Sequence, residues 1–244
     1  MSLKLVPLAA ALALAGTAGH AVTVNMTDFT YGSPATARMT GTGTSPTYDG
    51  AAGAFTGSLT DAPPSDALRS AVEATSSPSS FVAWCVELTQ TFNFGVDYQY
   101  SLIDGARYHF GNLGTDPNDH RLTDLSRLFT AAAQNRFVFD SAGSAAFQAG
   151  IWEIVYEHDA TAGYSFLTGS LLGAPGDPAN QTAFDTVDGY LGSLSRYAAS
   201  YHIDVLTSGD HQDFLVATVP EPETWAMLVG GLGLVGFMRR RRKA

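Results

Sequence analysis

The stretch that decides the fold is residues 141–156, which read SAGSAAFQAGIWEIVY. Its apolar positions predict a helix over Ser141–Tyr156, with Ser141 or Ser144 as the N-cap. Gln148 interrupts the apolar run, and a buried carboxamide needs partners for two donors and an acceptor. Trp152 follows four residues later, so the two side chains share one face of the helix. The sequence therefore predicts a buried helix with one polar group that a neighbouring segment must satisfy.

The second decisive stretch covers Phe81–Thr89 and reads FVAWCVELT. Its β-branched and aromatic residues predict a buried strand. The strand carries Cys85, the single cysteine of the chain. Because one cysteine cannot form a disulfide within the chain, Cys85 is either a small buried hydrophobic residue or a nucleophile.

The rest of the interior predicts one α+β domain in which antiparallel strands pack on a few helices. Composition divides it into a Thr/Gly/Ser-rich, β-like segment at 22–62 and a mixed domain at 63–218. Further strands are predicted at Val22–Asn25, Ala54–Leu59, Tyr98–Ile103, His202–Leu206 and Asp213–Thr218, the last two as a hairpin. Further helices are predicted at Ser65–Ala74, Leu122–Arg136 and Thr182–Tyr201, and loops at Thr75–Ser80 and Gly169–Asn180.

The N-terminus has the layout of a secretory signal peptide. Residues 1–21 combine Lys4, an apolar run over Leu5–Ala18, and small residues at Gly19 and Ala21. This arrangement predicts export through the Sec machinery, with cleavage after Ala21. The alternative is a buried first helix. Because exported thiols are open to oxidation, a single cysteine in such a protein calls for a reason.

Residues 219–244 form a second targeting segment. A short motif comes first, then 15 mostly apolar residues from Thr224 to Met238, and a run of cations follows. An independent membrane helix needs about 20 apolar residues, so this stretch is a marginal span. The cations favour the cytoplasmic side, which puts the body on the opposite side. The motif residues are Val219, Pro220, Glu221 and Pro222, and the cations include Arg239, Arg240, Arg241 and Arg242.

In order, spacing and terminal position, these features resemble the PEP-CTERM sorting signal of exopolysaccharide-producing Gram-negative bacteria. The resemblance implies that an exosortase, a membrane transpeptidase, recognises the tail at the inner membrane and cuts near Pro-Glu-Pro. The body is then released or transferred to the outer surface. The alternative from hydropathy alone is an ordinary tail anchor.

The negative charge of the body argues against binding to polyanionic partners such as nucleic acid. Between Val22 and Val219 there are 7 Arg and no Lys, against 21 of the 23 acidic residues, which gives a formal charge of −14. Such a body does not attract nucleic acid, and its charge favours solubility. Both lysines of the chain, Lys4 and Lys243, lie in the two targeting segments.

A buried cysteine beside a buried glutamine has the components of an internal thioester, in which sulfur replaces the amide nitrogen and ammonia leaves. Trp84-Cys85-Val86, and Phe147-Gln148 followed by Ile151-Trp152, resemble the motifs of Cys–Gln thioester domains of bacterial surface proteins. The resemblance implies a Cys85–Gln148 bond in a pocket lined by Trp84, Phe147, Ile151 and Trp152. The well-studied members of that family occur on Gram-positive surfaces and carry a different sorting tail.

Other groups indicate weaker chemistry. Three histidines are candidates to assist the thiol: His109, His158 and His202. The alternative is that each is an ordinary surface residue. The run Asp116–Asp119 lacks the ligand spacing of a calcium loop and favours a capped turn. Glu153 and Glu157 lie one turn apart on the predicted helix and are expected on a solvated face. The sequence predicts no metal and no cofactor, and it lacks the motifs of serine hydrolases, zinc proteases and P-loop proteins.

The sequence leaves three functions open. The first is a sorted surface or matrix protein that couples through its thioester to an exopolysaccharide hydroxyl or to an amine of a surface protein. The second is the same sorted protein as a structural or carbohydrate-binding component with an inert cysteine. The third is an exported hydrolase that uses acidic residues. The first is favoured, so the protein is not expected to be an enzyme.

Overall fold

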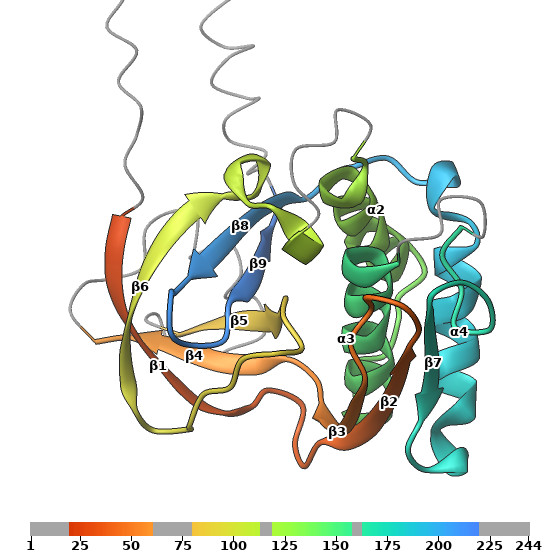
Figure 1. Ribbon diagram of the computed structural model, residues 1–244, viewed down its shortest axis with the longest axis horizontal. Coiled ribbons are helices and arrows are strands. Elements are labelled where there is room, and N and C mark those ends of the chain that lie inside the picture. Colours follow the sequence, from red (N-terminus) through yellow and green to blue (C-terminus); the bar gives the residue numbers. More distant parts are fainter. Residues whose placement is uncertain (1–19, 61–79, 113–118, 158–162, 220–244) are drawn as a thin grey trace, which may run out of the picture.

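A computed structural model describes residues 20–60, 80–112, 119–157 and 163–219. These residues form a closed barrel and a small three-stranded sheet, with helices packed between and beside them (Figure 1). The predicted mixture of antiparallel strands and helices is confirmed. Among the residues described, no helix is both long enough and apolar enough to cross a membrane.

Six antiparallel strands close the barrel in the order β1-β4-β5-β9-β8-β6. Closure pairs each of these strands on two sides, which removes the open edges that promote aggregation. Their bounds are β1 His20–Phe29, β4 Phe55–Leu59, β5 Ser80–Cys85, β6 Asp97–Asp104, β8 His202–Thr207 and β9 Phe214–Thr218. Every strand predicted from the sequence therefore belongs to the barrel, and β8 and β9 form the expected hairpin.

The Thr/Gly/Ser-rich segment at 22–62 contributes to this same barrel. β1 pairs with both β4 and β6, and β4 pairs with β5. Val24 and Met26 of β1 are buried two residues apart, as expected for one face of a strand. β1 begins at His20, so cleavage after Ala21, which stays a prediction, would remove the first two residues of the strand.

A second sheet, in the order β3-β2-β7, covers α3 on the side away from the barrel (Figure 1). Its strands are β2 Ala35–Gly41, β3 Tyr48–Ala52 and β7 Leu171–Pro175. The sequence did not predict these strands, because they are rich in Ala, Gly and Thr and short of large β-formers. The expected loop at Gly169–Asn180 is wrong over β7, which becomes a strand by pairing with β2.

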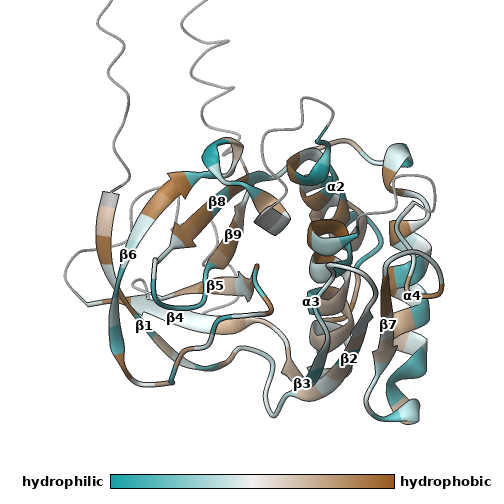
Figure 2. Cartoon of the chain, viewed as in Figure 1, coloured by the Kyte–Doolittle hydropathy of each residue, from teal (hydrophilic) through white to brown (hydrophobic). Residues whose placement is uncertain are grey.

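The described part of the chain contains three α-helices: α2 Arg121–Gln134, α3 Ser141–Tyr156 and α4 Gln181–Leu191. α3 stands between the barrel and the small sheet and contacts α2, α4 and all three strands of that sheet. Every residue of α3 from Gly143 to Tyr156 is buried. A helix without a solvated face is expected to carry apolar residues on every side. The brown segments along α3 in Figure 2 agree with this, and Ser144, Gln148 and Glu153 are its buried polar exceptions.

The beginning of α3 differs from the prediction. Asp140, and not Ser141 or Ser144, is the N-cap, because its carboxylate accepts a 2.8 Å hydrogen bond from the Gly143 N–H. Ser144 serves another contact, since its hydroxyl oxygen accepts a hydrogen bond from the Ala54 N–H at 2.9 Å. This hydroxyl links the start of α3 to the residue before β4.

Two predicted elements end early. β5 ends at Cys85 and not at Thr89. α4 ends at Leu191, where Gly192 forms the C-cap, and a 3₁₀ turn at Leu194–Arg196 follows in place of the helix predicted to Tyr201. Gly192 keeps a right-handed φ of −67°, so the chain tightens into the 3₁₀ turn without a left-handed cap, and the apolar spacing alone could not reveal this end.

Several predictions concern residues outside the described ranges. They are the signal peptide over residues 1–19, the helix at Ser65–Ala74, the loop from Thr75 onward, and the sorting tail from Pro220.

An aromatic cluster joins β5 to α2 and α3. Phe147 of α3 is fully buried, and its ring centroid lies 4.9 Å from Trp84, 5.0 Å from Phe129 and 5.1 Å from Phe139. A buried aromatic ring with several ring contacts contributes both apolar burial and specific edge-to-face packing. Phe147 is therefore a central link between the barrel and the helices.

Replacing Phe147 with Ala is expected to destabilise the fold by about 3–5 kcal/mol, because it opens a cavity at this link. Urea denaturation of the two proteins measures the difference. Val138→Ala is the matched control, since Val138 is 70% exposed, and it should change stability by less than about 0.5 kcal/mol. Equal effects of the two substitutions would contradict the assignment.

Candidate functional site

The two residues of the predicted thioester lie side by side. Cys85 is the last residue of β5, and Gln148 lies in the middle of α3. The Cys85 N–H donates to Gln148 Oε1 at 2.9 Å, and Gln148 Nε2 donates to the Cys85 carbonyl oxygen at 2.8 Å. Gln148 is 0% exposed. The buried carboxamide is therefore satisfied by the main chain of the cysteine itself.

The register of the barrel explains why a side chain contacts the main chain here. On one side of β5, the ladder with β4 ends at the pair Phe55–Ala83. On the other side, the Val86 N–H donates to the Asp213 carbonyl oxygen at 3.0 Å. Successive main-chain groups of a strand point to opposite sides, so those of Cys85 point to where β4 has ended. Gln148 supplies the acceptor and the donor that a peptide group of β4 would supply.

The side chain of Cys85 lies on the interior face of the barrel wall. Its cross-strand partner is Phe214 of β9, and opposed residues of antiparallel strands share one face of a sheet. The Phe214 ring contacts the rings of Phe55, Phe92 and Tyr100. The thiol is therefore held among aromatic residues, and Cys85 is only 7% exposed.

Burial dominates the protonation state of this site. It raises the pKa of the Cys85 thiol well above its ordinary value, and the Glu87 carboxylate raises it further. The thiol therefore stays protonated at neutral pH and needs a proton acceptor before it can act as a nucleophile. Burial also raises the pKa of Tyr48 and of Tyr156 to about 12, with a smaller contribution from Cys85 to each.

The four predicted pocket residues are all buried, but they lie on two sides of Cys85. Trp84 precedes Cys85 in the strand and so faces the opposite way, where it packs on Phe147. Trp152 instead packs on Tyr48 of β3, with ring centroids 5.0 Å apart. Its indole N–H is buried and has no hydrogen-bond partner among the described residues. Sequence reasoning missed Tyr48 because β3 itself was not predicted.

The two candidate histidines that the structure describes lie on the surface and are not placed to assist the buried thiol. His109 and His202 are exposed, and His158 lies outside the described residues. His202 Nε2 lies 3.2 Å from Asp204 Oδ1 and 3.9 Å from Asp104 Oδ2. Its contacts are therefore with one carboxylate of β8 and one at the end of the paired strand β6.

Glu153 and Glu157 are both buried, so the expected solvated face is wrong. Glu157 accepts hydrogen bonds from the Ser170 and Leu171 N–H groups and from the Ser170 hydroxyl. Glu153 Oε1 accepts from the Ser165 N–H at 3.0 Å. The two carboxyl groups hold the segment that leads into β7, a role that residue spacing alone could not reveal.

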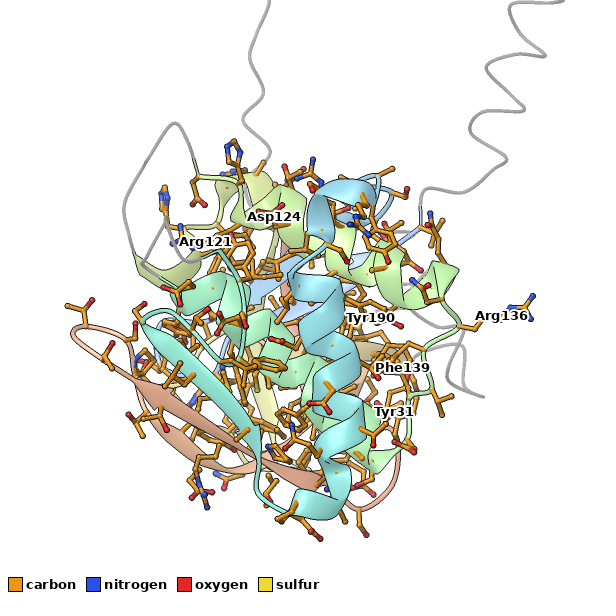
Figure 3. The ribbon with its side chains drawn as sticks, turned by 90° about the vertical axis from the view of Figure 1, so that its right-hand side faces the viewer. Tyr31, Arg121, Asp124, Arg136, Phe139 and Tyr190 are labelled. Carbon is orange, nitrogen blue, oxygen red and sulfur yellow. The ribbon has the colours of Figure 1, made fainter. Side chains whose placement is uncertain are left out.

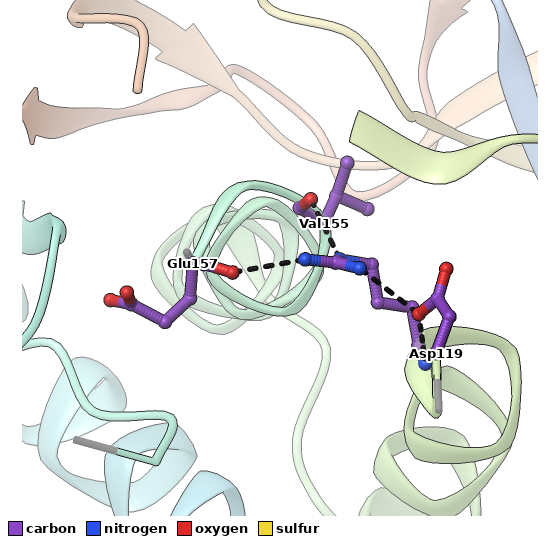
Figure 4. Close-up of polar contacts among 4 residues, drawn as sticks. Asp119, Val155 and Glu157 are labelled. Atoms are coloured by element: carbon purple, nitrogen blue, oxygen red, sulfur yellow. Dashed lines mark hydrogen bonds and ion pairs between the residues drawn. The ribbon is translucent and has the colours of Figure 1, made fainter. Parts of the chain in front are cut away.

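Arg121 closes the carboxyl end of α3 (Figure 4). Its guanidinium donates to the carbonyl oxygens of Val155 and Glu157, each at 3.1 Å, and to Asp119 Oδ1 at 3.0 Å. Asp119 is the one residue of the run Asp116–Asp119 that the structure describes, and its carboxylate orients the Arg121 side chain. Among the residues that the structure describes, no group of three or more His, Cys, Asp or Glu side chains is arranged to hold a metal.

A surface hollow of about 410 Å³ lies between the α2–α3 connection and one side of α4. Its lining includes Asn135, Arg136 and Tyr190 but none of the predicted thioester residues. Figure 3 shows Arg136 projecting from the body on this side of the molecule. The hollow is therefore a feature separate from the Cys85–Gln148 site.

Comparison with known families identifies the C-terminal segment. The family model of the PEP-CTERM protein-sorting motif matches residues 218–243. The chain therefore carries the signal of an exported protein that is sorted by an exosortase through a membrane-anchored intermediate. The match begins at Thr218, the last residue of β9. No curated protein and no solved structure matches the chain.

Glu153 makes stability depend on pH. It is 0% exposed, and burial, opposed by the Ser165 N–H, raises its pKa from 4.5 to about 9. The unfolded chain loses this proton near pH 4.5 while the folded protein keeps it to about pH 9. Stability therefore falls as pH rises between these values, by at most about 1.4 kcal/mol per pH unit.

Glu153→Gln should remove this dependence, because the amide is neutral at every pH and keeps an acceptor for the Ser165 N–H. Urea denaturation between pH 4 and pH 9 should show the variant more stable than the natural protein at pH 8 and similar to it near pH 4. Parallel curves for the two proteins over this range would show that Glu153 is ionised in the folded state.

Proposed function

We propose that this protein is a surface or matrix component whose body forms a thioester between Cys85 and Gln148 and couples covalently to an exopolysaccharide hydroxyl or a surface-protein amine. The sorting tail delivers the body to the outside of the cell. The thioester then supplies a permanent attachment there. The observation that carries the proposal is the pair of hydrogen bonds between the Gln148 carboxamide and the Cys85 main chain.

These hydrogen bonds favour attack on the carboxamide. The Cys85 N–H contacts Oε1, so it polarises the carbonyl and remains in place to stabilise the oxyanion that forms on that oxygen. Nε2 is fixed on the Cys85 carbonyl oxygen, which orients the leaving amine. The reacting groups are held by a strand end and a fully buried helix, so little freedom is lost on reaction.

The chemistry balances without a cofactor. Sγ of Cys85 attacks Cδ of Gln148, the C–S bond forms, the C–Nε2 bond breaks, and the thiol proton leaves with the nitrogen as ammonia. Later, an acceptor amine or hydroxyl attacks the same carbon. A new amide or ester forms, the C–S bond breaks, and Cys85 regains a proton.

Two features of the chain protect such a bond. The aromatic surroundings of Cys85 exclude water, which would otherwise hydrolyse the thioester. The body between Val22 and Val219 has no lysine, so its side chains offer no amine that could consume the bond. An external amine or hydroxyl therefore has less competition from the body itself.

A second candidate function is a sorted structural component with an inert cysteine. It is favoured by the same two hydrogen bonds, because a carboxamide that replaces a missing strand is also a sufficient structural link between α3 and β5. The raised pKa of the Cys85 thiol agrees with an unreactive group. The two candidates differ in one covalent bond, which mass measures directly.

The intact mass of the folded protein is expected to be about 17 Da lower than the sum of its residues, through loss of ammonia. Methylamine should then add about 31 Da and expose one alkylatable thiol. Cys85→Ala should have full mass and should not react. Gln148→Asn is the matched control, because it keeps the carboxamide but shortens its reach. Full mass with an unreactive buried thiol in the natural protein would leave the inert-cysteine function.

Deletion of residues 220–243 is expected to leave export intact and to abolish processing at the membrane, because the sorting motif at 218–243 is lost. Fractionation and mass spectrometry of the exported protein measure both. Replacing the four residues Arg239–Arg242 with glutamine removes their charge and tests whether the cation cluster by itself is needed for processing. An exported natural protein that retains the full tail would contradict sorting.

A further inference from the structure

Formation of the thioester requires a group that transfers a proton from the thiol to the leaving nitrogen. The Cys85 thiol is protonated, and the leaving nitrogen must receive a proton, so a group near Sγ has to carry a proton from one atom to the other. The candidate histidines are exposed or lie outside the described residues. Among the described residues, the candidates for this acceptor are the polar groups that surround the end of β5.

Two carboxyl groups lie in this region, Glu87 and Asp213. Asp213 is already engaged, since Oδ2 accepts from the Tyr108 and Thr207 hydroxyls at 2.9 and 3.1 Å, and Oδ1 accepts from the Ser208 N–H at 2.7 Å. Its oxygens hold the β8–β9 turn and are not available to the thiol. Asp213 is therefore a structural group.

Glu87 has an oxygen that is not engaged. It lies two residues after Cys85, and Oε2 is buried without a hydrogen-bond partner among the described residues. Its main-chain position is fixed, because its carbonyl oxygen accepts from Gln212 Nε2 at 3.0 Å. A buried carboxylate oxygen without a donor is costly unless it has another use. Transfer of a proton from the neighbouring thiol is such a use.

We infer that Glu87 is the proton-transfer residue of the Cys85–Gln148 site, taking the thiol proton during attack on Cδ and giving it to Nε2 as ammonia leaves. In the coupling reaction, Glu87 takes a proton from the attacking amine or hydroxyl and returns it to the departing Cys85 sulfur. Each cycle leaves Glu87 as it began. This inference rests on the proposed thioester and assigns its chemistry to a named side chain.

The electrostatics of the site agree with this role. Burial, with a contribution from Asp213, raises the pKa of Glu87 above its ordinary value, which makes its carboxylate a stronger base. Glu87 in turn raises the pKa of Cys85. The other titratable groups that face Glu87 are Asp213 and the phenols of Tyr108 and Tyr156. The phenols stay protonated across the neutral range, so they do not compete as bases.

The test measures methylamine incorporation into the full chain by intact mass between pH 5 and pH 9. Glu87→Gln is expected to slow incorporation by about 100-fold or more and to remove the part of the pH dependence that reflects Glu87. Glu87→Asp keeps a carboxylate and should recover part of the rate. A folded Glu87→Gln variant that never loses ammonia, while Glu87→Asp does, also supports the inference.

Glu153→Gln is the matched control, because it makes the same change at a buried carboxyl that belongs to the Ser165 contact. It should react at the natural rate. Equal slowing by Glu153→Gln, or a natural rate and pH profile in Glu87→Gln, would overturn the role of Glu87 and leave the thioester standing. Full mass in the natural protein would instead overturn the thioester itself, so the two failures are distinguishable.

Discussion

A carboxamide buried inside an apolar helix has to be satisfied, and the arrangement of this molecule depends on how Gln148 achieves it. α3 is enclosed by the barrel, two helices and the small sheet, so water does not reach its centre. The only way to keep Gln148 there without a large penalty is to give it matched partners. The main chain of Cys85 provides both, because the β4–β5 ladder stops two residues before Cys85, at the pair Phe55–Ala83.

The strands that make up the barrel, and the proximity of Cys85 to Gln148, could be predicted from the sequence, but the closure of the strands into a barrel could not. Strands such as Phe81–Cys85 carry large β-formers, and α3 has a long apolar run, so local pattern and final structure agree. Gln148 and Cys85 were predictable because each is chemically out of place, one as a polar group in an apolar helix and the other as a lone thiol. A polar residue in an apolar segment needs a hydrogen-bond partner, and such a mismatch therefore points to a contact with another unusual residue.

The small sheet and the second carboxyl cluster could not be predicted, because their structure comes from tertiary contacts. β7 is a strand only by virtue of its pairing with β2. Glu153 and Glu157 have the spacing of a solvated pair, yet a loop covers them and donates its N–H groups to them. Glu87 is an ordinary loop residue in the sequence, and its position two residues after Cys85 gave no sign that Oε2 would be buried without a hydrogen-bond partner among the described residues.

The position of β9 has a consequence for the encounter with the sorting enzyme. β9 ends at Thr218, and only five residues, 219–223, precede the hydrophobic stretch that begins at Thr224. A fully extended chain of that length spans less than about 20 Å. The length of this connection therefore limits how far the barrel can lie from the start of the hydrophobic stretch. An exosortase that acts on the motif at residues 218–243 therefore meets its substrate sequence directly at the end of a folded barrel.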